Sequence, residues 1–331
     1  MKFAAIPVAE AEGAILAHSV RAGAERLRKG LVLERGHLEK LQAAGIESVV
    51  AARLDADDVH EDEAALTVAR ALIGGSAGNL RLTRPGTGRV NVMAEGSGVA
   101  VLDAVRLGEV NRVNPMITVA TVPPFQQMEA GGMVATIKII SYGVPGRDIG
   151  KAVGRGRGAI AMNTPVMERA SLIITEIPGG AGEKGRDAIE ARLNALGVDL
   201  SQVCVVPHEI GALSDALAQA RGEVVLILTG SATSDMYDVG PEALRHAGGK
   251  VKRFGMPVDP GNLLFLGRLG KRPVIGLPGC ARSPALNGAD WVLSRVVCGL
   301  KVSNADIAGM GVGGLLKEIP TRPMPRKGRR R

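Results

Sequence analysis

Residues 224–238 read Val-Val-Leu-Ile-Leu-Thr-Gly-Ser-Ala-Thr-Ser-Asp-Met-Tyr-Asp. A run of five apolar residues bounded by turn signals is typical of a strand that is buried on both faces. A polar loop, 229–238, follows at once, and residues 239–247 then predict a helix with Pro241 in its first turn. Strand, loop and helix in this order form the repeating unit of a parallel α/β sheet.

The same unit recurs on both sides of this stretch. Further strands are predicted at 171–175, 202–206 and 274–277, and further helices at 185–196, 209–221 and 284–300. This alternation predicts an α/β fold for residues 169–302, a three-layer αβα domain with a mainly parallel sheet. Because ligands of such sheets bind beyond the carboxyl ends of the strands, we expect the site in loops 176–184, 207–209, 229–238 and 278–283.

The chain before residue 169 has a different pattern, which predicts a smaller α+β or β-rich N-terminal region. Residues 1–75 predict an α+β segment with a helix that ends near Gly45, a strand at 46–50 and a second helix at 59–73. The acidic stretch 55–63 favours the positive end of that second helix, with a metal site as the alternative. In the β-rich region 76–168, strands are predicted at 90–93, 98–102, 117–122 and 133–141.

The stretch 143–168 is rich in glycine and arginine, which we interpret as an interdomain linker within 76–168. A phosphate-facing loop at 154–158 is the alternative, but the Gly-x-Gly-x-Gly pattern there lacks the strand and helix of a dinucleotide fingerprint. Residues 303–331 are predicted to be a C-terminal extension that ends in a disordered basic tail.

Composition narrows the class of protein. Hydrophobic residues make up 46% of the 331 residues and charged residues 22%, which indicates a folded chain. Aromatic residues are only 2%, which argues against a stacking platform for single-stranded nucleic acid. Six basic residues follow Glu318, so residues 1–318 carry only +2 of the formal +8. We interpret the tail as a solvated terminus, with non-specific binding to acidic surfaces as the alternative.

Three widely spaced cysteines predict neither a disulfide framework nor a zinc knuckle. The N-terminus shows no basic segment before an apolar core, so we expect no signal peptide. No apolar run reaches the roughly 18 residues that span a bilayer. We therefore expect a cytoplasmic protein without membrane contact and without a specific nucleic-acid partner.

Loop 229–238 combines small hydroxylated residues with two acids. Backbone N–H groups and hydroxyls can hold a phosphate, and glycine permits close approach. Asp235 and Asp238 would repel that phosphate unless a cation such as Mg²⁺ lies between them. The structural alternative, which the sequence leaves equally open, is that one of these acids caps the following helix.

A second candidate loop, 276–284, reads Gly-Leu-Pro-Gly-Cys-Ala-Arg-Ser-Pro before the last long helix. Arg282 and Ser283 at a helix N-terminus would form an anion site. In the structural alternative Ser283 is the N-cap and Pro284 the first helical residue. Both can hold, because a cap and an anion use the same unpaired N–H groups.

The stretch 171–300 resembles the molybdopterin-binding domain shared by molybdopterin adenylyltransferases and molybdopterin molybdotransferases. Thr229-Gly230-Ser231, Asp238 and Pro241-Glu242 resemble the family's Thr-Gly-Gly loop with its later Asp and Pro-Glu. Residues 256–262 are similar to its Met-Lys-Pro-Gly-Lys-Pro element, and residues 276–283 to its Gly-Leu-Pro-Gly-Asn-Pro-x-Ser turn. Parts of the N-terminal region, such as 13–18, 41–46 and 134–140, resemble the molybdotransferases.

Several positions depart from the family pattern. Ser231 stands where the second glycine is usual, Asp235 replaces a glycine, and Cys280-Ala281 replaces Asn-Pro. Pro257 stands in place of the lysine, and only Thr175-Glu176 remains of the usual Thr-Gly-Asp-Glu-Leu segment. The resemblance therefore bears on the fold and on pterin binding more directly than on the reaction.

The resemblance implies molybdopterin as ligand, Mg²⁺, an ATP or AMP moiety, and a transferase reaction at the molybdopterin phosphate, either adenylylation or molybdate insertion. Asp238 would be the catalytic carboxylate that holds the metal, with Asp235 as helper. The residues expected to bind the cofactor are Thr229, Gly230, Ser231, Thr233, Ser234, Gly279, Arg282, Ser283, Thr175 and Glu176.

Two other functions stay open. The altered pocket positions favour a non-catalytic carrier or accessory protein that binds molybdopterin for a molybdoenzyme. A nucleotide hydrolase is a weaker alternative, because competence-damage-type proteins resemble the same domain. We also expect a homo-oligomer, since pockets of the relatives are often completed by a neighbouring subunit.

Overall fold

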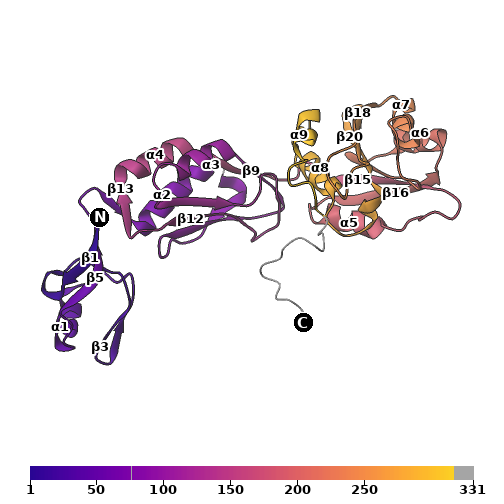
Figure 1. The fold of residues 1–331 in the computed structure, drawn as a ribbon. Coiled ribbons are helices and arrows are strands. Elements are labelled where there is room, and N and C mark those ends of the chain that lie inside the picture. The colour runs from indigo at the N-terminus through magenta and orange to yellow at the C-terminus, as the bar shows by residue number, and fades with distance from the viewer. Residues whose placement is uncertain (76, 317–331) are drawn as a thin grey trace. The chain divides into compact units, whose positions relative to one another are not determined.

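The computed structural model describes residues 1–75 and 77–316, and the chain divides into two compact units (Figure 1). The first consists of Met1–Gly96 and Ala100–Met162, and the second begins at Asn163 and takes in Ser97–Val99. The predicted basic tail lies outside the described residues. The four-part division of the sequence stays a prediction.

The first unit begins with a small antiparallel sheet. Strand β5 (Ser48–Arg53) pairs with β1 (Lys2–Pro7) on one side and with β2 (Ile15–Leu16) on the other. Strands β3 (Val20–Ala22) and β4 (Glu25–Leu27) form a separate hairpin. The predicted early helix is α1 (Arg35–Ala43), whose Leu38 and Leu41 are buried in this local core.

The larger part of the first unit is a helix-covered sheet. Its strands follow the order β10 (Ile117–Thr121), β12 (Met133–Ile139), β8 (Arg89–Ala94), β7 (Leu80–Leu82). Helices α2 (Glu61–Ile73), α3 (Ala104–Asn111) and α4 (Gly146–Gly156) lie over it (Figure 1). Two small sheets join β11 (Gln127–Met128), β9 (Gly98–Leu102) and β14 (Ile160–Asn163), and β6 (Asp58–His60) with β13 (Gly143–Pro145).

The acidic stretch forms the start of α2, as the helical interpretation predicts. Glu61, Asp62 and Glu63 occupy the first turn, and the ring Nδ1 of His60 accepts a hydrogen bond from the Asp62 N–H at 3.3 Å. Negative side chains at this end favour the helix because its dipole is positive there.

The linker interpretation is wrong for most of the Gly/Arg-rich stretch, although the division between the two compact units falls inside it, between Met162 and Asn163. Gly146–Gly156 forms α4, with Ile149, Ala152 and Gly156 buried. A Cβ at Gly156 would lie 2.7 Å from the Val110 side chain of α3 and 2.8 Å from the Leu72 side chain of α2. The glycine that suggested a flexible linker therefore permits close helix packing, which the sequence pattern does not show.

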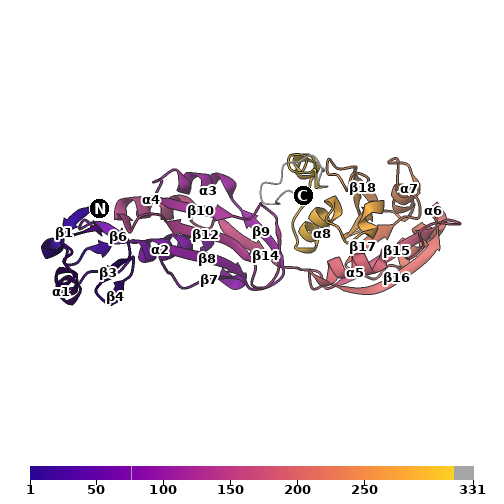
Figure 2. The ribbon, with the colours of Figure 1, turned by 60° about the horizontal axis from the view of Figure 1, so that its bottom comes forward.

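The second unit is built on one six-stranded sheet. Its order is β16 (Asp199–Pro207), β15 (Arg169–Glu176), β17 (Val224–Leu228), β20 (Arg272–Leu277), β19 (Phe265–Leu269), β18 (Lys250–Phe254). The first four strands are parallel, and β19 runs antiparallel to both of its neighbours, β20 and β18. Figure 2 shows β15, β16 and β17 side by side. The sequence did not predict β18 and β19, whose charged residues weaken the apolar signal of a strand.

Helices cover both faces of this sheet. Leu172 and Ile174 share a core with α5 (Arg186–Asn194) and α8 (Gly288–Val297). Ile173, which points to the other face, shares a core with α6 (Ile210–Gln219) and α7 (Val239–His246). This arrangement confirms the predicted three-layer αβα domain with a mainly parallel sheet.

The last long helix begins later than predicted. Gly279–Arg282 forms a short 3₁₀ helix, and α8 starts at Gly288 with Asn287 as N-cap. Asn287 and Asp290 form a capping box. The Asn287 side chain accepts a hydrogen bond from the backbone N–H of Asp290, and the Asp290 side chain accepts one from the backbone N–H of Asn287. The prediction of Ser283 as N-cap is therefore wrong. A short helix, α9 (Asn304–Gly309), follows.

Two global expectations can be compared with the structure. The cysteines Cys204, Cys280 and Cys298 are free, and burial raises the pKa of the Cys298 thiol to about 11. Among residues 1–75 and 77–316, we find no helix with the length and apolar character needed to cross a bilayer.

Gly276, in the centre of the sheet, has no space for a larger side chain. A Cβ at Gly276 in β20 would overlap the buried ring of Phe265 in β19. We expect Gly276→Ala to lower the free energy of unfolding by about 1–3 kcal/mol, measured by urea denaturation. The control is Gly211→Ala in α6, where no atom lies within 4 Å of the new Cβ. Equal stability of the two variants would contradict the proposed overlap.

Candidate functional site

Three loops leave the sheet of the second unit at one edge. Loop 177–185 follows β15, loop 229–238 follows β17, and loop 278–287 follows β20. Since β15, β17 and β20 are parallel neighbours, their carboxyl ends lie together. The fold thus brings the predicted site residues from all three loops to one edge, where ligands of parallel sheets bind.

Thr175 ties three strand ends together at this edge. Its buried Oγ1 accepts a hydrogen bond from the Gly230 N–H at 2.9 Å and lies 2.7 Å from Nδ1 of His208, just after β16. The His208 N–H donates to the carbonyl of Glu176 at 2.9 Å. A Cβ at Gly230 would lie 2.6 Å from the Thr175 carbonyl oxygen, so the close approach requires glycine. Thr175 therefore fixes the start of loop 229–238 against β15. His208 was not among the site residues that the sequence predicted.

Loop 229–238 presents different groups to the interior and to the surface. Thr229 and Thr233 are buried, with their hydroxyl oxygens 3.4 Å apart. Ser231, Ser234 and Asp235 are exposed. The N–H groups of Ser231, Ala232 and Thr233 donate no hydrogen bond within the described part of the chain. Consecutive unpaired amides beside hydroxyls suit an oxyanion.

Asp238 is the N-cap of α7, as the structural alternative predicts. Its Oδ1 accepts from the Val239 N–H at 2.7 Å and its Oδ2 from the Ser234 N–H at 2.9 Å. Asp235 Oδ1 accepts from the Tyr237 N–H at 2.8 Å. Both acids therefore fix the shape of the loop, whether or not they also hold a cation.

The acids fit Mg²⁺ only as part of a ligand set. No group of three or more His, Cys, Asp or Glu side chains suited to a metal occurs among the described residues. A carboxylate oxygen that accepts one N–H keeps a second lone pair, so Asp238 and Asp235 remain able to coordinate. Mg²⁺ commonly takes one or two carboxylates and completes its shell with substrate phosphates and water.

Arg282 contacts the backbone of two other loops. Its guanidinium donates to the carbonyls of Gly182 and Thr229, each at 3.0 Å, and to that of Lys184. Burial lowers its pKa. These bonds connect loop 177–185 to the end of β17 and occupy much of the guanidinium that was expected to meet a phosphate.

The other two predicted site residues of loop 278–287, Ser283 and Gly279, make fewer contacts than Arg282. Ser283 is exposed, and its Oγ accepts from the Ala285 N–H at 3.2 Å, which forms a local turn. Gly279 is exposed at the start of the 3₁₀ helix. Gly185 has φ +99° and a Cβ there would lie 2.6 Å from Arg282 Cα, so loop 177–185 can pass Arg282 only with glycine at this position.

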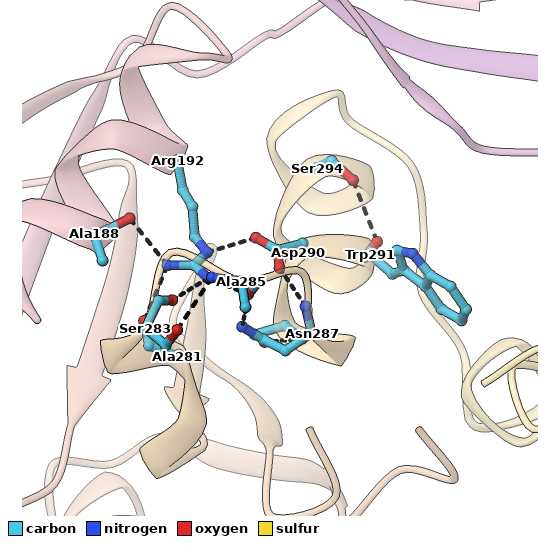
Figure 3. Close-up of polar contacts among 10 residues, drawn as sticks. Ala188, Arg192, Ala281, Ser283, Ala285, Asn287, Asp290, Trp291 and Ser294 are labelled. Atoms are coloured by element: carbon cyan, nitrogen blue, oxygen red, sulfur yellow. Dashed lines mark hydrogen bonds and ion pairs between the residues drawn. The ribbon is translucent and has the colours of Figure 1, made fainter. Parts of the chain in front are cut away.

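Arg192 of α5 fixes the path of loop 278–287, and no sequence pattern predicted this role. Its Nε donates to Asp290 Oδ1 at 2.5 Å, and its terminal nitrogens donate to the carbonyls of Ala188, Ala281, Ser283 and Ala285 at 2.7–3.0 Å (Figure 3). All five N–H donors of the guanidinium are thus used. Asp290 also accepts from the Asn287 N–H at 2.7 Å, so one ion pair fixes both the loop and the cap of α8.

This network predicts a large effect of one substitution. Arg192 and Asp290 are only 10% and 15% exposed, so Arg192→Met leaves a poorly hydrated carboxylate and four carbonyls without their donor. We expect the free energy of unfolding to fall by about 3–5 kcal/mol, measured by chemical denaturation. Arg186→Met, on the same helix, removes an exposed pair with Glu183 and should cost under about 1 kcal/mol. Similar losses of unfolding free energy in the two variants would contradict a large stabilising role for the Arg192 network.

Comparison with known families agrees with the geometry of this edge. Residues 170–295 match the family described as "probable molybdopterin binding domain", and residues 5–53 match a domain family of unknown function. Residues 170–295 of the second unit are therefore similar to this family. The match confirms the family resemblance, and it includes the loops after β15, β17 and β20. No curated protein matches the chain.

Solved structures with similarity to the chain are remote. One is the crystal structure of a molybdopterin biosynthesis MoeA protein from Pyrococcus horikosii, with 14% identity, a TM-score of 0.32, and coverage of 90% of this chain and 75% of that chain. Another is a molybdenum cofactor biosynthesis protein from Pyrococcus furiosus, with 13% identity, a TM-score of 0.24, and coverage of 93% and 65%. TM-scores this low do not establish a shared overall arrangement.

Proposed function

We propose that the molybdopterin-binding domain holds molybdopterin by its phosphate at the carboxyl edge of the sheet, as a step in molybdenum cofactor biosynthesis. The observation that supports this most is loop 229–238, which offers unpaired amides and exposed hydroxyls directly after a parallel strand. Gly230 lets the loop lie against β15, and Thr175 fixes it there. A loop that is already ordered binds an anion without a large loss of conformational entropy.

The proposed chemistry is transfer at this phosphate, either adenylylation or molybdate insertion. In adenylylation a phosphate oxygen of molybdopterin attacks the α-phosphorus of ATP, and pyrophosphate leaves. In molybdate insertion water attacks the AMP phosphorus of adenylylated molybdopterin, the phosphoanhydride bond breaks, and AMP leaves while molybdate binds the molybdopterin. The protein's part in both reactions is to orient phosphates and stabilise their charge.

Different residues would bind the phosphates, hold the metal ion and position the loops. The amides of Ser231, Ala232 and Thr233, with the Ser231 hydroxyl, would bind phosphate oxygens. Asp238 and Asp235 would hold Mg²⁺, which when bound offsets the negative charge of the phosphates. Arg282 would act on the ligand mainly by keeping loop 177–185 in place, because its guanidinium already donates to carbonyls.

A carrier without turnover is the second candidate. Both oxygens of Asp238 accept backbone N–H groups, and Arg282 contacts three carbonyls. The charged side chains at this edge therefore have structural partners, as expected for a pocket that binds but does not catalyse.

A titration separates the two. Purified protein is titrated with molybdopterin and with its adenylylated form in the presence of Mg²⁺, while AMP and pyrophosphate are followed. For the transferase we expect binding and release of AMP on adding molybdate, or of pyrophosphate on adding ATP. Tight binding without nucleotide chemistry supports the carrier, and no binding of either form refutes the proposal. The expected homo-oligomer is tested on the same sample by light scattering.

Substitution of the two acids tests the role of the metal. Asp238→Asn keeps one oxygen that can cap α7 but removes the charge and the second acceptor, so we expect turnover to fall by about 100-fold or more while the free energy of unfolding falls by only about 1 kcal/mol, the value of one hydrogen bond. Asp235→Asn should raise the Mg²⁺ concentration needed for half-maximal rate. The matched control is Asp215→Asn, an exposed acid of α6 away from the loops. Turnover in Asp238→Asn equal to that of the control would rule out Asp238 as the metal-holding carboxylate.

A further inference from the structure

A cavity of about 760 Å³ lies at the other edge of the same sheet. Its wall includes Met167, which precedes β15, and Lys271, which precedes β20. Both strands are parallel and begin there, so this is the amino edge. The cavity is therefore separate from the loops at the carboxyl edge.

The wall of this cavity, which we call the basic cavity, is rich in positive charge. Five cationic residues line it: Lys252, Arg253, Arg268, Lys271 and Lys301. No Asp or Glu is among its lining residues. Apolar side chains complete it, with Leu266 from β19, Val296 from α8 and Leu300 just after α8.

These cations lack negative partners inside the protein. Within residues 1–75 and 77–316, none of the five lies within 4 Å of a carboxylate oxygen. Arg253 donates its Nε to the Gly255 carbonyl at 2.8 Å, and the four others are exposed. Cations held around one concave wall repel one another and raise the local concentration of anions.

Structural roles account for only part of this charge. The carboxyl end of α8 supplies about half a negative charge, which offsets at most a fraction of one cation. Lysine on the edge strand β18 discourages pairing with other chains, which explains Lys252 but not Lys301, which comes after α8. The convergence of cations from β18, the β19–β20 hairpin and the end of α8 points to a ligand.

We propose that the basic cavity binds a small molecule with several phosphate groups and an apolar part, such as a nucleoside triphosphate. The volume lies within the range of about 300–1,000 Å³ that is usual for small-molecule sites. Lysine and arginine together supply point charges and paired donors for phosphate oxygens. The apolar wall would contact the base or another apolar group. Because the cavity lies away from the carboxyl edge, its ligand is distinct from the substrate of the proposed reaction.

Calorimetric titration of the full chain with ATP and with inorganic tripolyphosphate tests this site. EDTA is present, so that Mg²⁺-dependent binding at the carboxyl edge does not contribute. We expect one molecule bound per chain, with an affinity that falls as salt is raised. Tighter binding of ATP than of tripolyphosphate supports the apolar contact. Absence of binding by both, or binding of a single-stranded RNA in place of both, overturns the proposal.

Matched lysine variants locate the bound anion. Lys271→Gln combined with Lys301→Gln should weaken binding about tenfold or more, since a hydrogen bond to a charged group is worth at least that factor. Lys250→Gln, an exposed lysine of β18 outside the lining, should leave affinity nearly unchanged. Asp238→Asn should also have no effect. Equal losses in the Lys250 variant, or no loss in the double variant, would contradict the assignment, whatever the outcome for molybdopterin.

Discussion

The ion pair between Arg192 and Asp290 is the constraint on which the candidate site depends. The Arg192 side chain is only 10% exposed, so its guanidinium must satisfy its donors within the protein, because each one left without a partner costs free energy. It does so with Asp290 and four carbonyls, three of them in the loop after β20. The loop has little repeating structure of its own, so its path follows from the geometry of one planar side chain.

Arg282 and Thr175 extend the same principle to the neighbouring loops. Arg282 bonds carbonyls of loop 177–185 and of Thr229, and Thr175 accepts the Gly230 N–H. The three loops are thus linked mainly through backbone groups. This arrangement leaves the surface of loop 229–238 with amides and hydroxyls free to meet a ligand. The opposite edge of the sheet differs, since its cations have no carboxylate partners within the described residues. One sheet therefore presents two edges of different chemistry.

The sequence-based predictions were correct where the role of each residue depends on its neighbours in the sequence. The apolar run at 224–228 and the acidic start of α2 followed from strand burial and the helix dipole, whereas a cap at Asp238 was one of the interpretations that the sequence left open. One error depends on distant contacts: Gly156 lies against Leu72 and Val110, which the sequence pattern does not show. The other is a missed local signal: Asn287 and Asp290, three residues apart, form a capping box, so α8 begins at Gly288 and not near Ser283.

The sequence by itself determined the αβα class and the order of most strands and helices in the second unit, and it indicated the loops that meet at the carboxyl edge of the sheet. It could do so because strand burial and helix capping are local properties, and because the motifs at 229–242 and 276–283 are continuous segments. Only the tertiary structure decided that Arg192 organises the late loop, that Arg282 contacts carbonyls, and that five cations meet at the amino edge. Those residues lie far apart in the chain, and a side chain's partners follow from the packing of the whole domain.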